Sequence, residues 1–145
     1  MPRIPAIAAS AGQRHDITDQ AQKAAETFKE GALLLMDANE DMAECGADPA
    51  LIYGFALNAA DKYPVTGRVL VQKLWEGQQV WMDGDNAPTK ADINQSYGVT
   101  KDADGIWHVD GTKTAGSARV YVHEIDTHRN RYLVSVLAAN RQVAP

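Results

Sequence analysis

The chain has one cysteine, Cys45, among its 145 residues. A single thiol cannot close an intrachain disulfide, so the fold does not depend on an oxidising compartment, and we expect it to form in a cytoplasm. Long apolar runs are missing too. The longest run near the N-terminus, residues 4–9, is far shorter than the ~20 residues of a membrane span and shorter than the apolar core of a signal peptide. We therefore expect no membrane anchor and no membrane partner.

An excess of positive charge is missing as well. The formal net charge is -5, and the lysines and arginines are scattered along the chain. Binding to a phosphate backbone needs clustered basic residues, so nucleic acid is not an expected partner. What is present is the composition of one globular domain, with 45% hydrophobic and 23% charged residues, and no internal repeat is visible. A chain of this length can bury a core of its own.

Motifs of enzymes and metal proteins are also missing. The four histidines, which titrate nearest to neutral pH, stand at positions 15, 108, 123 and 128. No HExxH or comparable spacing connects them, and strand alternation would place His123 and Glu124 on opposite faces of a sheet. No serine lies in a GxSxG context, and Cys45 has no histidine near it in sequence. We expect no catalytic residue, no cofactor and no metal, and a packed thiol at Cys45.

Two acidic stretches, residues 83–86 and 102–105, resemble fragments of calcium loops. Neither is followed by the bidentate glutamate that a twelve-residue calcium loop requires, whereas Asp-Gly is a common hairpin signal. We interpret both stretches as turns. Trp75, Trp81 and Trp107, together with the five tyrosines, favour a core or a subunit interface over a face for stacking ligands, since each large ring buries about 150–250 Å².

Residues 1–26 are rich in alanine and polar groups and poor in large apolar side chains. They are predicted to form an extended N-terminal arm. Within this arm, residues 16–26 are compatible with a short helix, because Asp16 or Thr18 can cap alanines that recur at near-helical spacing. An arm that orders on binding adds strand-like hydrogen bonds and small apolar anchors to a neighbour.

From residue 27 to 145 the signals are those of an all-β domain, a small antiparallel β-barrel or β-sandwich. Short apolar runs rich in Val, Tyr and Trp alternate with turns that contain Gly, Asp and Asn. The predicted strands cover residues 32–36, 42–45, 53–57, 68–75, 79–82, 106–110, 118–125 and 131–138. Short helical turns are predicted at 48–52 and 89–93, and residues 97–99 are expected to return toward the sheet.

Four local patterns occur together along the chain. They are Thr27-Phe28-Lys29-x-Gly31 before the first apolar strand, Cys45-Gly46-Ala47-Asp48-Pro49 followed by Ile52-Tyr53-Gly54-Phe55-Ala56, the strand start Gly67-Arg68-Val69, and the closing stretch 120–136. As a set, spanning about residues 27–138, they resemble the decoration proteins that cement the capsids of tailed bacteriophages. The resemblance implies a β-rich, non-enzymatic virion protein on the exterior of the phage head, commonly a trimer.

The partner that the resemblance implies is the major capsid protein, whose subunit contacts the domain would stabilise. The arm residues expected to contact the capsid or a neighbouring copy are Ile4, Pro5, Ile7 and Ile17. A homo-oligomer, with a trimer favoured, would turn a modest contact into avidity. Two alternatives are a tail or baseplate β-domain of a virion, and a small β-barrel that binds a sugar or peptide through its tryptophans.

Overall fold

The computed structural model describes residues 6–7, 16–62 and 66–143. In these ranges the chain forms eleven strands and three single-turn 3-10 helices, which confirms the all-β class. The strands are β1 (Ala6–Ile7), β2 (Asp16–Ala21), β3 (Leu33–Met36), β4 (Met42–Glu44), β5 (Gly54–Ala56), β6 (Arg68–Lys73), β7 (Val80–Asp83), β8 (Ser96–Lys101), β9 (Trp107–Asp110), β10 (Val120–Asp126) and β11 (Arg131–Val136). The 3-10 helices are η1 (Lys90–Asp92), η2 (Ala115–Ser117) and η3 (Ala138–Asn140).

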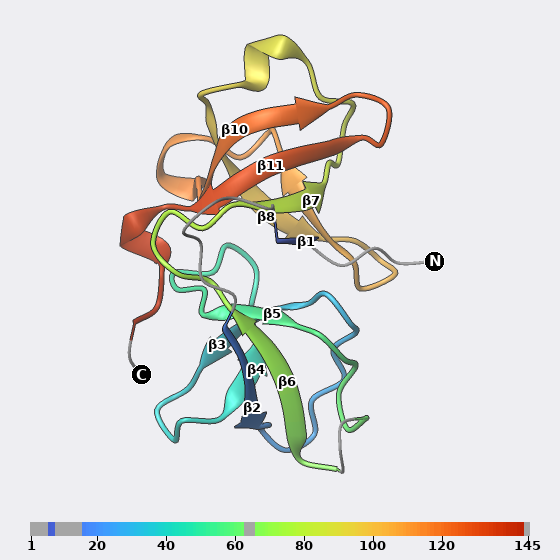
Figure 1. The fold of residues 1–145 in the computed structure, drawn as a ribbon, viewed down its shortest axis with the longest axis vertical. Helices are drawn as coiled ribbons and strands as arrows, with labels where there is room; N and C mark the ends of the chain where they lie inside the picture. The colour runs from blue at the N-terminus through green and yellow to red at the C-terminus, as the bar shows by residue number, and fades with distance from the viewer. Residues whose placement is uncertain (1–5, 8–15, 63–65, 144–145) are drawn as a thin grey trace.

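The strands form two antiparallel sheets, which occupy the two halves of the molecule (Figure 1). Five strands in the order β2-β6-β5-β3-β4 make one sheet, which we call the β2–β6 unit. Six strands in the order β1-β7-β11-β10-β8-β9 make the other sheet. We call strands β7 to β11 the β7–β11 unit, and β1 is an additional strand at the edge of this unit. Buried side chains from both units form one hydrophobic cluster, so the molecule has a single core.

Each unit curves until a parallel bridge joins the residue after its first strand, β2 or β7, to its third strand, β4 or β9. In the β7–β11 unit the bridge joins Gly84, just after β7, to Val109 on β9, and the sheet is a nearly closed barrel. In the β2–β6 unit the bridge joins Gln22, just after β2, to Met42 on β4. Closure of this kind covers the strand edge at the bridge and leaves the rest of β2 at the edge of its sheet.

The two units repeat one topology. Replacing β2 to β6 in turn by β7 to β11 converts the first strand order into the second, and all the neighbouring pairs are antiparallel in both. The register agrees as well, because Ala21 faces Arg68 in one unit and Asp83 faces Arg131 in the other. The repeat is invisible in the sequence because a sheet requires a pattern of burial rather than particular side chains.

Backbone hydrogen bonds outside the strand ladders repeat too. Gly31 and Asn94 take the same place and both have positive φ, 87° and 69°, which glycine and asparagine tolerate best. The matched bonds, donor first, are Lys23 to Met42 and Asp85 to Val109, Tyr53 to Leu34 and Arg119 to Tyr97, Gly31 to Ala56 and Asn94 to Val122, and Leu74 to Tyr53 and Leu137 to Arg119. The two units therefore share a backbone framework as well as a strand order.

The prediction of a helix over residues 16–26 is wrong. Residues 16–21 are strand β2, which pairs with β6 along its whole length, and residues 24 and 25 form a turn. Along β2 the side chains of Ile17 and Asp19 are exposed while Thr18 and Gln20 are half-buried, which is the alternation of a strand. Six cross-strand pairs outweigh the weak helix preference of a few alanines. An arm ending at residue 26 is therefore wrong, since β2 belongs to the sheet.

The predicted helical turn at 48–52 is also wrong. The backbone groups of Ile52 form hydrogen bonds with the C-terminal segment instead of closing a helical turn. The Ile52 N–H donates to the Asn140 carbonyl at 2.7 Å, and the Gln142 N–H donates to the Ile52 carbonyl at 2.9 Å. The turn at 89–93 is confirmed as η1, where the Thr89 N–H donates to Asp92 Oδ2 at 2.8 Å. The eight predicted strands and the return at 97–99 all correspond to observed strands.

Candidate functional site

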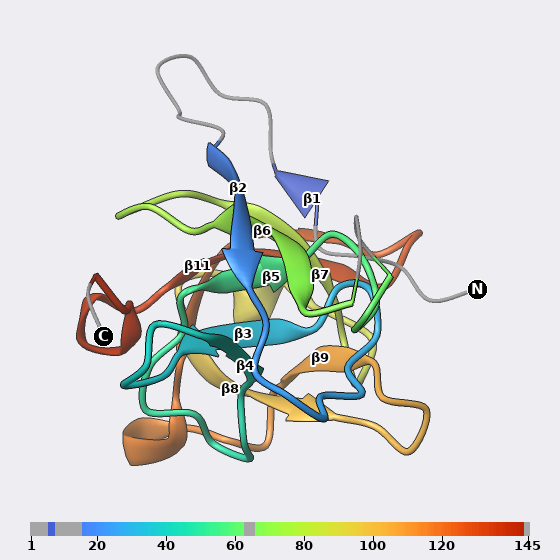
Figure 2. The same cartoon turned by 90° about the horizontal axis from the view of Figure 1, so that it is seen from below.

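Strand β2 lies at the edge of its sheet, beside β6 in both views of the ribbon (Figures 1 and 2). Its backbone groups alternate between the two sides of the strand. The Gln22 N–H points inward to the Gly67 carbonyl, at 2.8 Å, whereas the Lys23 N–H points outward to the Met42 carbonyl, at 2.9 Å. The outer side of β2 is therefore the side that presents the backbone groups of its odd-numbered residues.

The backbone groups of Ile17 and Asp19 lie on that outer side by the same alternation. Among residues 6–7, 16–62 and 66–143, no backbone group pairs with them there, since β2 has β6 as its one ladder partner. We call this stretch, residues 17–19 on the outer side of β2, the open edge. An open strand edge is a template on which another extended chain can add hydrogen bonds.

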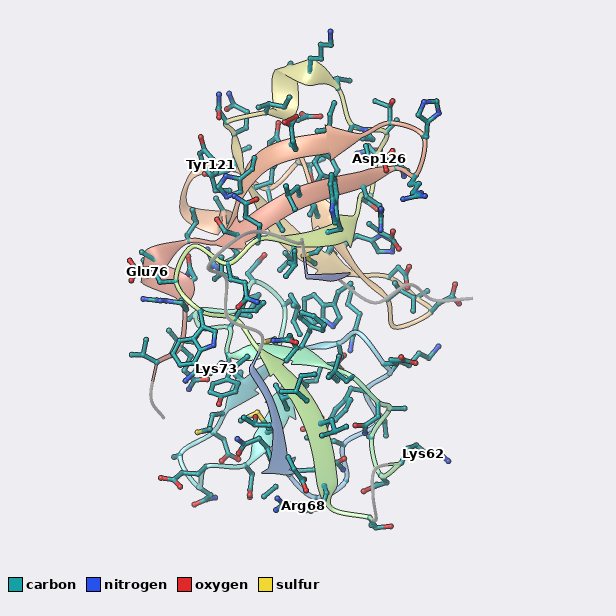
Figure 3. The ribbon with its side chains drawn as sticks, viewed as in Figure 1. Lys62, Arg68, Lys73, Glu76, Tyr121 and Asp126 are labelled. Carbon is teal, nitrogen blue, oxygen red and sulfur yellow. The ribbon has the colours of Figure 1, made fainter. Side chains whose placement is uncertain are left out.

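The side chains along the open edge combine one apolar group with one ion pair. Ile17 is 56% exposed, an unusual position for a large branched apolar side chain. Arg68 begins β6 opposite Ala21, the last residue of β2 (Figure 3). Its Nε lies 3.0 Å from Asp19 Oδ1, and its Nη2 donates to the Asp19 carbonyl at 3.1 Å. The two charged side chains are 40% and 47% exposed, so this pair stabilises the fold little, but charge on an edge strand opposes unspecific pairing.

The four residues predicted to contact a capsid or neighbour fall in different places. Ile4 and Pro5 lie outside the described residues. Ile7 is in β1, where it faces Val80 of its own chain. Ile17 is exposed on β2, in the other sheet. The structure thus separates Ile7 from Ile17, and sequence reasoning missed Arg68 and Asp19, whose pairing depends on a register that only the fold supplies.

His123 is the histidine with the clearest local chemistry. It sits at a β-bulge of β10, and its Nε2 lies 2.7 Å from Ser135 Oγ on β11. The Tyr121 ring packs against the imidazole edge to face with centroids 4.9 Å apart. Burial lowers the pKa of His123 below its ordinary value because it disfavours the charged ring. A serine and a histidine are thus paired, but within residues 6–7, 16–62 and 66–143 no carboxylate hydrogen-bonds to His123 as the third group of a triad would.

Cys45 is a packed thiol, as predicted. It is buried, its Sγ lies 3.7 Å from the Leu51 carbonyl, and burial raises its pKa to about 12. The three tryptophans differ in burial. Trp107 belongs to the core, whereas Trp75 and Trp81 are half-buried, with Lys73 Nζ 4.3 Å from the centre of the Trp75 ring. The core interpretation is therefore right for Trp107, and a cation covers the Trp75 ring.

The acidic stretch 102–105 is a hairpin turn, as predicted. Asp102 Oδ1 accepts hydrogen bonds from the N–H groups of Asp104 and Ile106, at 2.8 and 3.0 Å, and Oδ2 lies 2.7 Å from His108 Nε2. The stretch 83–86 is a turn only in part, because Asp83 ends β7 and the next residue forms the closing bridge. Within the described ranges no group of three or more His, Cys, Asp or Glu side chains is placed to hold a metal ion.

Two cavities lie where the units meet. One, of about 260 Å³, is lined by residues 27–29 and Glu44 from one unit and residues 101–105 from the other. The second, of about 210 Å³, is lined by Cys45, Trp107 and Lys113 among others. Their lysines are already engaged, since Lys101 Nζ lies 2.7 Å from Glu44 Oε1 and Lys113 Nζ lies 2.8 Å from an Asp48 carboxylate oxygen. These two lysines are therefore not free to pair with a ligand.

No model of a protein family matches the chain, and no curated protein matches its sequence. No helix in the described part of the chain is long and apolar enough to cross a membrane. The functional proposal therefore rests on the geometry of the molecule. In that geometry, the open edge of β2 is a place where an extended segment of another chain can pair.

Proposed function

We propose that the protein is a structural capsid decoration protein, which binds the exterior of a phage head and stabilises contacts between major capsid subunits. The observation that carries the proposal is the open edge of β2, where backbone groups without a ladder partner lie beside the exposed side chain of Ile17. A rigid all-β body with one core can transmit a contact at this edge without refolding. The four sequence patterns that resemble the decoration family supply the choice of a capsid as partner.

Mechanism here means mechanical attachment rather than catalysis. A strand edge supplies main-chain hydrogen bonds to a neighbour, and an exposed branched side chain supplies apolar contact area. One such edge buries little surface, so several copies acting together are needed for tight attachment, and a homo-trimer on the head surface would provide them. Attachment of this kind adds bonds across capsid subunits and so raises the cost of separating them.

Co-sedimentation with undecorated phage heads tests the proposal. The full chain is expected to pellet with heads, and Ile17→Asn is expected to weaken that binding, because the apolar contact is lost while the β2 ladder is kept. Val143→Asn is the matched control, since Val143 is also an exposed branched residue, 70% accessible, but lies in the C-terminal segment. Absence of binding by the full chain, or equal loss in both variants, would contradict the proposal.

A deletion tests the part played by the N-terminal segment. Removing residues 1–15 takes away β1 and leaves β2 in its sheet. Removing residues 1–26 would also remove β2, so its effect on binding would report unfolding rather than attachment. Under the proposal, the 1–15 deletion stays folded by circular dichroism and binds heads more weakly. Unchanged binding would show that the segment takes no part in attachment.

A small-ligand module is the second candidate, favoured by the cavity that Trp107 lines between the units. A sugar or peptide entering it would alter tryptophan fluorescence, so titration with a glycan panel separates the two functions. A decoration protein is expected to show no saturable change. The tail or baseplate alternative is separated by repeating the sedimentation with purified tails in place of heads.

A further inference from the structure

The strand that corresponds to β2 in the other unit already carries an added strand. On β7, the outer side pairs with β1 in an antiparallel arrangement, in which Ala6 faces Trp81 and Ile7 faces Val80. The pairing lies just before Gly84, the residue that closes the β7–β11 unit through its bridge to Val109. One strand edge of this molecule therefore accepts a short extended segment at a defined place.

The open edge of β2 occupies the same place in the repeated framework. Trp81 lies three residues before the bridging Gly84, and Asp19 lies three residues before the bridging Gln22. Trp81 faces Leu133, the third residue of β11, and Asp19 faces Leu70, the third residue of β6. The arginine that opens the neighbouring strand also recurs.

The side chain at this position interacts with that arginine in both units. Arg131 stacks over the Trp81 ring, with its guanidinium carbon 5.2 Å from the ring centre, and Arg68 pairs with Asp19 at 3.0 Å. The two edges thus have the same pairing register, the same position relative to the closing bridge, and an arginine at the start of the neighbouring strand. They differ in that, among the described residues, the β7 edge holds a strand and the β2 edge does not.

We infer that the open edge of β2 is an acceptor for an antiparallel extended segment of a partner protein, paired with residues 18 and 19 as β1 is paired with β7. The N-terminal segments of other copies of this chain cannot fill every edge. Each chain has one such segment, β1, but two edges, those of β2 and β7. Pairing of β2 with the β2 of another copy about Asp19 would set two aspartates opposite each other, which is unfavourable.

The chemistry of the partner segment follows from both edges. The segment on β7 is built of small and branched apolar residues, Ala6 and Ile7, next to Pro5 in the sequence. The residue facing Asp19 should carry no negative charge, and a basic residue there would form a cross-strand pair with it. The residue two positions further along faces the Ile17 side of the strand and is apolar. That the segment belongs to a capsid subunit rests on the proposed function, but the acceptor itself does not.

A synthetic peptide with the sequence of residues 2–10 of this chain, PRIPAIAAS, tests the acceptor without capsids. Titrated into the full chain, followed by NMR and amide hydrogen exchange, it is expected to shift the Ile17 and Asp19 amides and to slow their exchange about 10-fold or more at saturation, with weak, roughly millimolar affinity. A peptide methylated on the Ala6 nitrogen, which cannot donate that ladder bond, is expected not to bind.

A matched pair of variants separates the edge from the ion pair. Asp19→Pro and Asp19→Asn both lose the carboxylate that forms the ion pair with Arg68 and keep the backbone carbonyl to which Arg68 Nη2 donates. Only the proline removes the outward N–H, and proline is tolerated on an edge strand. Peptide binding should be kept in D19N and lost in D19P. No change at Ile17 and Asp19 up to the solubility limit, or changes confined to Val80 and Trp81, would overturn the inference. The two proposals fail separately. If the peptide does not bind the β2 edge but the protein still sediments with heads, only the inference about the edge fails. If the peptide binds but the protein does not sediment with heads, only the proposed function fails.

Discussion

Gly54 on β5 shows how tightly single residues are constrained in these two sheets. A Cβ at this position would lie 2.2 Å from the Gln72 carbonyl oxygen, a backbone atom that cannot move without breaking the β5–β6 pairing. Gly54→Ala is therefore expected to destabilise the fold by about 3 kcal/mol, at the upper end of overpacking costs. Urea unfolding of the purified variant measures this.

Gly46 supplies the control for that substitution. A Cβ there meets nothing within 4 Å, and the residue is exposed in the loop after β4. Gly46→Ala should stay within about 0.5 kcal/mol of the parent chain. If the two alanine variants unfold at the same urea concentration, the close packing of β5 on β6 is not what constrains Gly54.

His123 is expected to make stability depend on pH. Burial lowers its pKa in the folded chain below the ordinary value of about 6.5, so the unfolded chain binds the proton more readily. Stability from this group is full above about pH 6.5 and is lost as the pH falls from there to the folded pKa. The lowered pKa values of Asp48, Asp92, Asp102 and Asp126 act in a more acidic window, below their ordinary value of 3.8.

Urea unfolding of the parent chain and of His123→Gln, at about pH 7.5 and about pH 5, measures the effect. The parent should lose stability between the two pH values, and the variant should lose less. His128→Gln is the control, because His128 lies exposed in the turn between β10 and β11. An unchanged pH dependence in H123Q would show that the partial burial of His123 does not affect its titration.

Single residues were predicted well where the cause is local. The packed thiol of Cys45 and the hairpin turn at Asp102 follow from nearby sequence alone. Glu44 was not found, because its partners Lys101 and Trp107 lie 57 and 63 residues away and meet it only when the two units come together. Ile17 was selected for its apolar side chain, and its exposure on an edge strand is a property that the fold adds.

At the scale of elements, the C-terminal segment that follows β11 binds the β2–β6 unit and so connects the two units. We call this contact the clamp. Gln142 is 4% exposed, and its side chain pairs with both backbone groups of Met36 on β3: Oε1 accepts from the N–H and Nε2 donates to the carbonyl, each at 2.7 Å. Gln142→Ala leaves two partly buried backbone groups without these partners. The expected loss is about 1–3 kcal/mol in the free energy of unfolding.

Val143→Ala is the control, because the neighbouring Val143 is largely exposed and its aliphatic side chain forms no hydrogen bond. Its midpoint of urea unfolding should match that of the parent chain. Equal midpoints for Q142A and the parent would mean that water replaces the two bonds to Met36 without cost, and that the clamp contributes nothing to stability.

Elements were predicted well where buried and partly buried residues alternate, as in β10 and the first part of β6, and where consecutive β-preferring residues are buried, as in β11. Strand β2 was missed because its apolar content is low and its alanines resemble a helix, whereas its conformation is set by pairing with β6. The repeat of the two units was missed for a related reason. Equivalent positions hold different residues, such as Gly54 and Val120, each placed opposite the same strand neighbours in its unit.

At the scale of the whole molecule, the repeat raises the question whether each unit unfolds by itself. The contacts across the boundary argue against it. Glu44 accepts a hydrogen bond from Trp107 Nε1 at 3.1 Å and pairs with Lys101, while the C-terminal segment of one unit pairs with Ile52 of the other. Because the buried side chains also form one cluster, loss of either unit would expose apolar surface of its partner.

We therefore expect one cooperative unfolding transition. Val71 on β6 and Val134 on β11 are buried at equivalent positions, so their amides should exchange through the same global opening and show the same free energy of exchange. Glu44→Ala should lower both values together, because the contacts it removes span the boundary. A larger free energy at one valine than at the other, in the parent chain, would show that the two units are separate folding units, with the repeat as two domains rather than one.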